Sequence, residues 1–99
     1  MVGLVTLDRI RARRAEILAL AERHGASDVR VFGSVLRGDA REDSDIDLLV
    51  RFHAGRSLLD HVALRQDLAD LLESEVDVVS EPALHWFIRD RVLAEAEPL

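Results

Sequence analysis

The chain has 99 residues, of which 48% are hydrophobic, and it carries a formal net charge of −6 at pH 7. This length predicts one domain spanning residues 1–99 with a modest core, and the apolar fraction argues against intrinsic disorder. The lack of cysteine excludes disulfides and thiolate metal sites, and an acidic surface opposes direct nucleic-acid binding. Because no apolar run is long enough for a membrane span, we expect a cytoplasmic protein without membrane contact.

The first predicted element is a helix that begins at Thr6 and ends before Gly25, a residue typical of the position after a helix. The arginines between positions 9 and 14 are interpreted as a solvated face that pairs with acids such as Glu16, and contact with an acidic partner or a phosphate is the alternative. His24 is interpreted as a charge partner of the helix end rather than as a ligand. The helical spacing rests on Leu7, Ile10, Ile17, Leu20 and Ala21.

A short β-branched stretch, 29–32, predicts a strand that ends at Gly33. Glycine lets the backbone turn sharply and approach a ligand closely. A helical turn that begins at Ser34 has free N–H groups, which suit a phosphate. Arg37 in this turn either neutralises phosphate charge by a forked contact or pairs with Asp39, and the sequence leaves both open.

After a charged loop at 39–43, a second strand is predicted to carry two acids. Asp45 and Asp47 are two residues apart, so their side chains share one face, while the apolar residues between them and after them line the other. Paired carboxylates favour a hard divalent cation such as Mg²⁺. Ser44 is expected to enter this strand and orient a neighbouring carboxylate. An edge strand with a wet face is the alternative.

The next helix is predicted to begin after Ser57, with Asp60 placed to complete a capping box. His61 in this helix is interpreted as a surface or packing residue. The stretch 75–80 predicts a third strand in which Asp77 interrupts a run of valines. A cluster of Asp77 with the two earlier acids is favoured over an acid that faces water on an edge strand.

Pro82 suits the first turn of a last helix, which is predicted to run to about Glu95. Three large apolar residues, 86–88, follow one another, and a helix cannot bury all three on one face. We therefore expect Trp86 to remain available for a partner or for self-association.

The element order is helix, strand, short helix, strand, helix, strand, helix. It favours an α/β (α+β) domain with a small mixed sheet and helices packed mainly on one face, and a small parallel βαβ arrangement is the alternative.

The ordered combination of Gly33-Ser34, Arg37-Gly38, Ser44-Asp45-Ile46-Asp47 and a later Asp77 resembles the signature of the nucleotidyltransferase superfamily related to DNA polymerase β. The resemblance covers about residues 28–80. It is closest to the minimal nucleotidyltransferase (MNT) proteins, which are often the antitoxin of a HEPN/MNT toxin–antitoxin pair.

The resemblance implies the nucleotidyltransferase fold and a function for each motif. Asp45, Asp47 and Asp77 would be catalytic and would hold Mg²⁺, with two ions about 4 Å apart. ATP is the expected substrate, and AMP would be transferred to a hydroxyl, on a tyrosine, of a HEPN toxin. Nucleotide binding would fall to Gly33, Ser34, Arg37 and Ser44.

Larger relatives carry a second domain that binds the acceptor, for which 99 residues leave no room. The acceptor is therefore expected on another macromolecule or on a second subunit. The chain has no tyrosine, so it cannot modify itself on one. Two other hypotheses are a non-catalytic antitoxin that masks its toxin by binding, and transfer to a small molecule such as an antibiotic, against which the missing acceptor domain argues.

Overall fold

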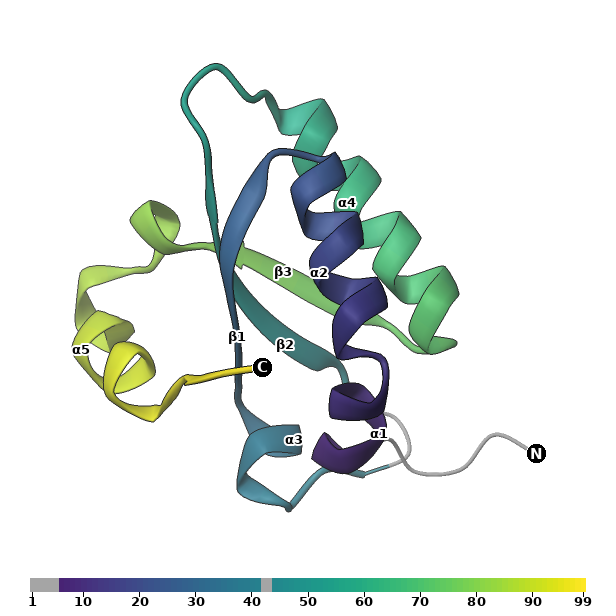
Figure 1. Ribbon diagram of the computed structural model, residues 1–99. Coiled ribbons are helices and arrows are strands. Elements are labelled where there is room, and N and C mark those ends of the chain that lie inside the picture. The colour runs from purple at the N-terminus through teal and green to yellow at the C-terminus, as the bar shows by residue number, and fades with distance from the viewer. Residues whose placement is uncertain (1–5, 42–43) are drawn as a thin grey trace.

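The computed structural model describes residues 6–41 and 44–99. A four-stranded sheet in the order β3-β2-β1-β4 forms its centre (Figure 1). β1 (Ala26–Phe32) runs antiparallel to β2 (Ile46–Phe52) and to β4 (Glu97–Pro98), whereas β2 and β3 (Val76–Ser80) are parallel. The predicted mixed sheet is confirmed. The alternative, a small parallel βαβ arrangement, describes only β2, the helix that follows it and β3, because the other two pairings are antiparallel.

Three helices cover one face of the sheet: α1 (Leu7–Ala12), α2 (Arg14–Arg23) and α4 (Leu58–Leu72) (Figure 1). Between them and the strands lies the main core, in which Ile10, Ile17, Val31, Leu48 and Leu64 are fully buried. Burial of these side chains is the dominant favourable term in folding.

The single helix predicted from Thr6 is in fact two, because the chain leaves helical geometry at Arg13. The Arg13 N–H donates to the Ile10 carbonyl, three residues back, instead of continuing the four-residue ladder. Ile10 and Ile17 keep helical spacing across the break and are both buried. The apolar pattern therefore contains no signal of the break.

The helix α4 begins as predicted, with the Ser57 side chain accepting from the Leu59 N–H and Asp60 accepting from the Ser57 N–H. His24, at the end of α2, contacts Asp67 of α4 (Nε2–Oδ2, 2.6 Å). The side-chain partner of His24 therefore belongs to another helix. His61 stacks on Phe52, which confirms its packing role.

The second face of the sheet carries a 3₁₀ turn η1 (Glu81–Ala83) and α5 (Trp86–Glu95). The short helix α3 (Ser34–Arg37) follows β1 and places Val35 in the main core. The prediction that Pro82 begins the last helix is wrong. Pro82 lies in η1, and the two residues after η1 are extended, which brings Leu84 into a small second core with Leu49 and Val92. α5 begins only after His85, whose Nδ1 accepts from the Phe87 N–H.

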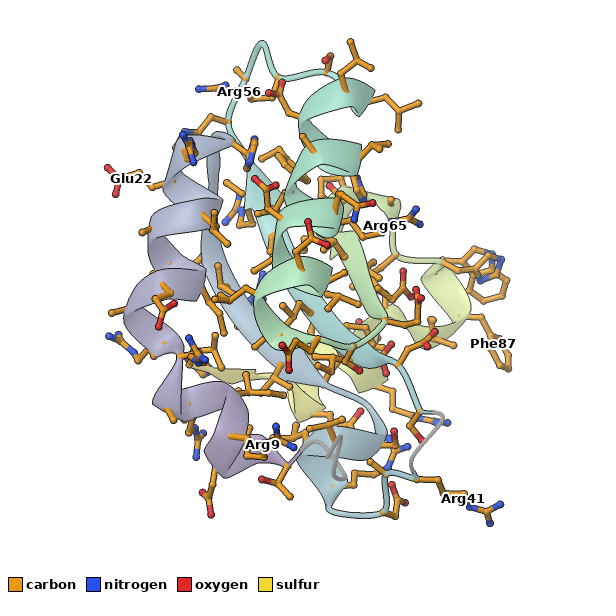
Figure 2. All side chains as sticks on the ribbon, turned by 90° about the vertical axis from the view of Figure 1, so that its right-hand side faces the viewer. Arg9, Glu22, Arg41, Arg56, Arg65 and Phe87 are labelled. Atoms are coloured by element: carbon orange, nitrogen blue, oxygen red, sulfur yellow. The ribbon has the colours of Figure 1, made fainter. Side chains whose placement is uncertain are left out.

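The start of α5 leaves apolar side chains exposed, as predicted for Trp86. Trp86 is 79% exposed and lies edge-on to Phe87, with ring centroids 5.8 Å apart. Figure 2 shows Phe87 pointing away from the body of the molecule. None of the helices in the described ranges has the length and apolar character needed to span a bilayer.

Candidate active site

The candidate site lies where β1 ends and where β2 and β3 begin. In the sheet register, Asp47 of β2 is opposite Phe32 of β1 on one side and opposite Asp77 of β3 on the other. Gly33 follows Phe32 directly. Asp47 shares a strand face with Leu49, which packs in the second core, so the site is on the sheet face that carries α5.

Gly33 approaches Asp47 more closely than any other residue type could. Its φ is +80° and its ψ is −157°, a conformation that is essentially restricted to glycine. A Cβ atom added at Gly33 would lie 2.1 Å from Asp47 Oδ2. The sequence predicted a close backbone approach here, but to a ligand rather than to this carboxylate.

The Asp47 carboxyl is half-buried, and its pKa is raised from 3.8 to about 6. Burial is the largest cause, and the negative charges of Asp77 and Asp45 add to it. The positive charge of Arg37 opposes the rise, whereas Glu95 contributes to it slightly. The structure therefore places all three predicted acids within electrostatic reach of one another.

Arg37 at the end of α3 contacts two carboxylates. Its Nη1 donates to Glu95 Oε1 at 2.7 Å, and its Nε lies 3.6 Å from Asp39 Oδ2. The Glu95 contact is the main reason that the pKa of Arg37 is raised. The pairing with Asp39 was one of the two predicted options. Sequence reasoning missed Glu95, because the two residues are 58 positions apart and no motif connects them.

Three other predicted site residues surround this centre. Ser34 is half-buried at the first position of α3. Asp45 is exposed and directly precedes β2. The prediction that Ser44 enters β2 is wrong, since the strand begins at Ile46 and the Ser44 Oγ accepts from the Arg41 N–H at 2.8 Å. Residues 42 and 43 of the predicted charged loop lie outside the described residues.

The carboxylate oxygens at this site are ligands of the kind that a hard divalent cation prefers. In the part of the chain that the structure describes, no three acidic or histidine side chains are grouped closely enough to hold a metal. The carboxylates nevertheless repel one another at Asp47, which is the electrostatic condition that a bound cation relieves. Asp45 and Asp77 are exposed, so rotation of their side chains is unhindered by packing. Asp45, Asp47 and Asp77 would hold such an ion.

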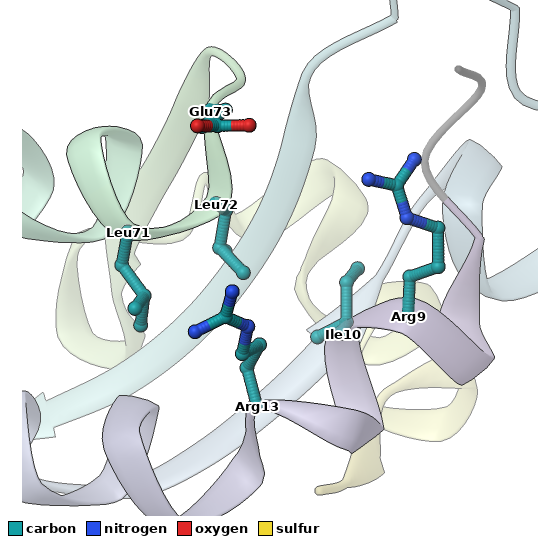
Figure 3. Close-up of a pocket in the computed structure, with 6 residues that line it drawn as sticks. All are labelled: Arg9, Ile10, Arg13, Leu71, Leu72 and Glu73. Atoms are coloured by element: carbon teal, nitrogen blue, oxygen red, sulfur yellow. The ribbon is translucent and has the colours of Figure 1, made fainter. Parts of the chain in front are cut away.

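A separate small pocket lies on the other side of the sheet. Figure 3 shows Arg9, Ile10 and Arg13 facing the end of α4 across it. The pocket is also lined by Leu71, Leu72 and Glu73, and it contains none of the predicted site residues.

The match to known sequences covers the whole site. A family model described as a nucleotidyltransferase domain matches residues 15–98. The chain belongs to this nucleotidyltransferase family. The family predicted from the ordered combination of Gly-Ser, Arg-Gly, Asp-x-Asp and a third Asp is thereby confirmed, whereas the role of each residue stays a prediction.

The relatives of this nucleotidyltransferase specify the class of enzyme. The protein adenylyltransferase MntA of Thermococcus cleftensis is 40% identical over 95 residues, which cover 95% of this chain and 96% of the relative. A solved structure described as a candidate minimal nucleotidyltransferase is 57% identical, with a TM-score of 0.86 over 96% of this chain and 97% of its own. The chain is a nucleotidyltransferase enzyme with the minimal nucleotidyltransferase fold.

A more distant neighbour shares the fold. It is a chain from the complex of a tri-AMPylated Shewanella oneidensis HEPN toxin with its MNT antitoxin. That chain is 21% identical, with a TM-score of 0.67 over 89% of this chain and 69% of its own.

Proposed function

We propose that this nucleotidyltransferase is an antitoxin that transfers AMP from ATP to a tyrosine hydroxyl of a HEPN toxin and so neutralises the toxin. The observation that carries the proposal is Asp47, a carboxylate with a raised pKa that is held between the Gly33 backbone and Asp77. Structural acids on a strand face have no need of such a costly arrangement. The name of the Thermococcus relative and the AMPylated toxin of the Shewanella complex support the same reaction.

The residues of the chain divide into two groups in this reaction. The Gly33 and Ser34 backbone and the Arg37 guanidinium bind the phosphates of ATP, because N–H groups and a forked cation match phosphate oxygens. Ser44, directly before Asp45, is tied to the Arg41 backbone by its hydroxyl. Asp45, Asp47 and Asp77 would hold Mg²⁺, which would supply positive charge against the charge that develops on the phosphates.

The reaction forms one bond and breaks one. The acceptor oxygen attacks the α-phosphorus of ATP, and the bond from this phosphorus to the bridging oxygen of the leaving pyrophosphate breaks. Asp77, the more exposed of the two acids on β2 and β3, takes the proton of the acceptor hydroxyl. The products are a phosphodiester between AMP and the toxin side chain, and pyrophosphate. ATP as the substrate agrees with a cytoplasmic location.

A second candidate function is neutralisation of the toxin by binding alone. It is favoured by the aromatic pair Trp86 and Phe87, which is exposed on the same sheet face as the acids. A mask of this kind needs the aromatic pair but not the carboxylates.

Intact-mass spectrometry of the toxin after incubation with ATP and Mg²⁺ tests the proposal. The wild-type protein should add one or more AMP units, and a chelator or the substitution Asp77→Ala should prevent the addition. Asp77→Ala should still bind the toxin, because it removes an interaction that is needed in the transition state. An unmodified toxin that both proteins neutralise equally in cells would leave binding alone as the function.

A further inference from the structure

Glu95 is the more buried member of the ion pair with Arg37. Its side chain is 21% exposed, whereas that of Arg37 is 49% exposed. The bond between them is short, at 2.7 Å from Nη1 to Oε1. Charge-assisted bonds of this length are among the strong hydrogen bonds of proteins.

The backbone of Glu95 is held on both sides. α5 ends at this residue, and the N–H of the next residue, Ala96, donates to the Val92 carbonyl, with Val92 buried in the second core. β4 then pairs with β1, placing Glu97 opposite Val31. Glu95 is therefore presented by a fixed part of the fold.

Arg37, in contrast, lies at the end of a short helix. α3 has only four residues and ends at Arg37, before Gly38. The other acidic contact of Arg37 is with Asp39, at 3.6 Å, whose side chain is itself largely exposed. The firm contact of the guanidinium is thus the one with Glu95. Since a guanidinium has five N–H donors, this bond leaves several of them for a phosphate.

We propose that Glu95 is a positioning residue of the nucleotide site, which holds the Arg37 guanidinium in place to receive the phosphates of ATP. The inference rests on the proposed function, because it requires that the site binds ATP.

The charge of Glu95 opposes this effect, since a carboxylate near the site repels phosphate. The proposal requires that ordering of the arginine outweighs this repulsion, and the ATP affinity of Glu95→Ala measures the balance of the two effects.

A double-mutant cycle tests the proposal, with ATP affinity measured by calorimetry in the presence of Mg²⁺. Loss of a charge-assisted bond to phosphate should make Arg37→Ala bind ATP about tenfold more weakly. Glu95→Ala should weaken binding about fivefold, through the disordered arginine. The double variant should bind like Arg37→Ala alone. Glu95→Gln keeps an acceptor oxygen and should restore most of the affinity.

Glu97→Ala is the matched control. Glu97 also pairs with an arginine, Arg11, at 3.4 Å, and it belongs to the same C-terminal segment. Its loss should weaken that segment without changing ATP affinity. Equal effects of Glu97→Ala and Glu95→Ala would reduce Glu95 to an anchor of the chain end.

Two further results overturn the proposal. ATP affinity that is unchanged or higher in Glu95→Ala would mean that the carboxylate only repels phosphate, and losses that add in the double variant would mean that Glu95 acts independently of Arg37. Either result leaves the transfer of AMP by the wild type intact. Wild-type protein that binds no ATP would refute the proposed function, and the role of Glu95 with it.

Discussion

Asp47 combines three features that are unfavourable for an aspartate: partial burial, two acidic neighbours, and a backbone with positive φ against its carboxylate. Burial and the two acidic neighbours raise the free energy of the charged form in the folded state. Such a cost is common at functional sites, where the arrangement serves ligand binding instead of stability.

The raised pKa of Asp47 predicts a pH-dependent gain in stability for Asp47→Asn. Because folding raises this pKa from 3.8 to about 6, the group contributes fully to stability below the unfolded value, and the contribution is lost as the pH rises through about 6. The variant, which is always neutral, should melt on the order of a few degrees higher at neutral pH. The gain is modest because solvent screens a half-exposed group.

Thermal melts of both proteins, in chelator and from neutral pH down to about 4, measure this difference. The gain should shrink as the pH falls and vanish near the low end. A gain that persists at low pH would contradict the assigned pKa and point to packing instead.

The conformation of Gly33 predicts that a substitution at this position lowers both stability and ATP affinity. Gly33→Ala introduces both a strained backbone and a Cβ atom 2.1 Å from Asp47 Oδ2, so the carboxylate must move. We expect lower stability, by about 1–2 kcal/mol from the backbone alone, together with a loss of ATP affinity. Gly55→Ala is the control, since Gly55 has a φ of +86° and nothing within 4 Å of the added atom.

Calorimetric ATP titrations and melts of the two glycine variants separate the effects. Both should lose stability, and only Gly33→Ala should lose ATP affinity. Similar ATP binding by the two variants would show that the position of Asp47 against Gly33 has no part in nucleotide binding.

At the scale of elements, the sequence predicted what depends on local pattern. The strands that carry Asp47 and Asp77 and the start of α4 follow from alternation and from a capping box. The Gly-Ser and Asp-x-Asp motifs identified the family for the same reason, since each motif is confined to a few consecutive residues.

What the sequence could not predict depends on contacts between distant segments. β4 has two residues and exists only because β1 offers it an edge. Pro82 lies in η1 and not in α5, because Leu84 between the two elements fills the second core, although Pro82 alone is a good start for a helix. The bond from Arg37 to Glu95 joins α3 to the end of α5 and has no local signal.

In the whole molecule, the two faces of the sheet differ in how much of the core they carry. The face under α1, α2 and α4 contains most of the core, and its burial accounts for most of the stability (Figure 1). The other face has only a small core of Leu49, Leu84 and Val92 beside the acids. It is the face that a partner must reach if it brings the acceptor hydroxyl.

The exposed start of α5 therefore predicts where the toxin binds, with self-association through the same helix as the alternative. Trp86→Ala should weaken toxin binding by roughly tenfold or more, because buried tryptophans are frequent hot spots of interfaces. Leu59→Ala is the control: Leu59 is also 79% exposed, but it belongs to α4 on the opposite face, and its loss should change affinity by less than about twofold. Calorimetry with the toxin and sedimentation of the free protein distinguish the two partners. Reduced self-association with unchanged toxin binding would make α5 a subunit contact, and equal effects of the two substitutions would place the toxin elsewhere.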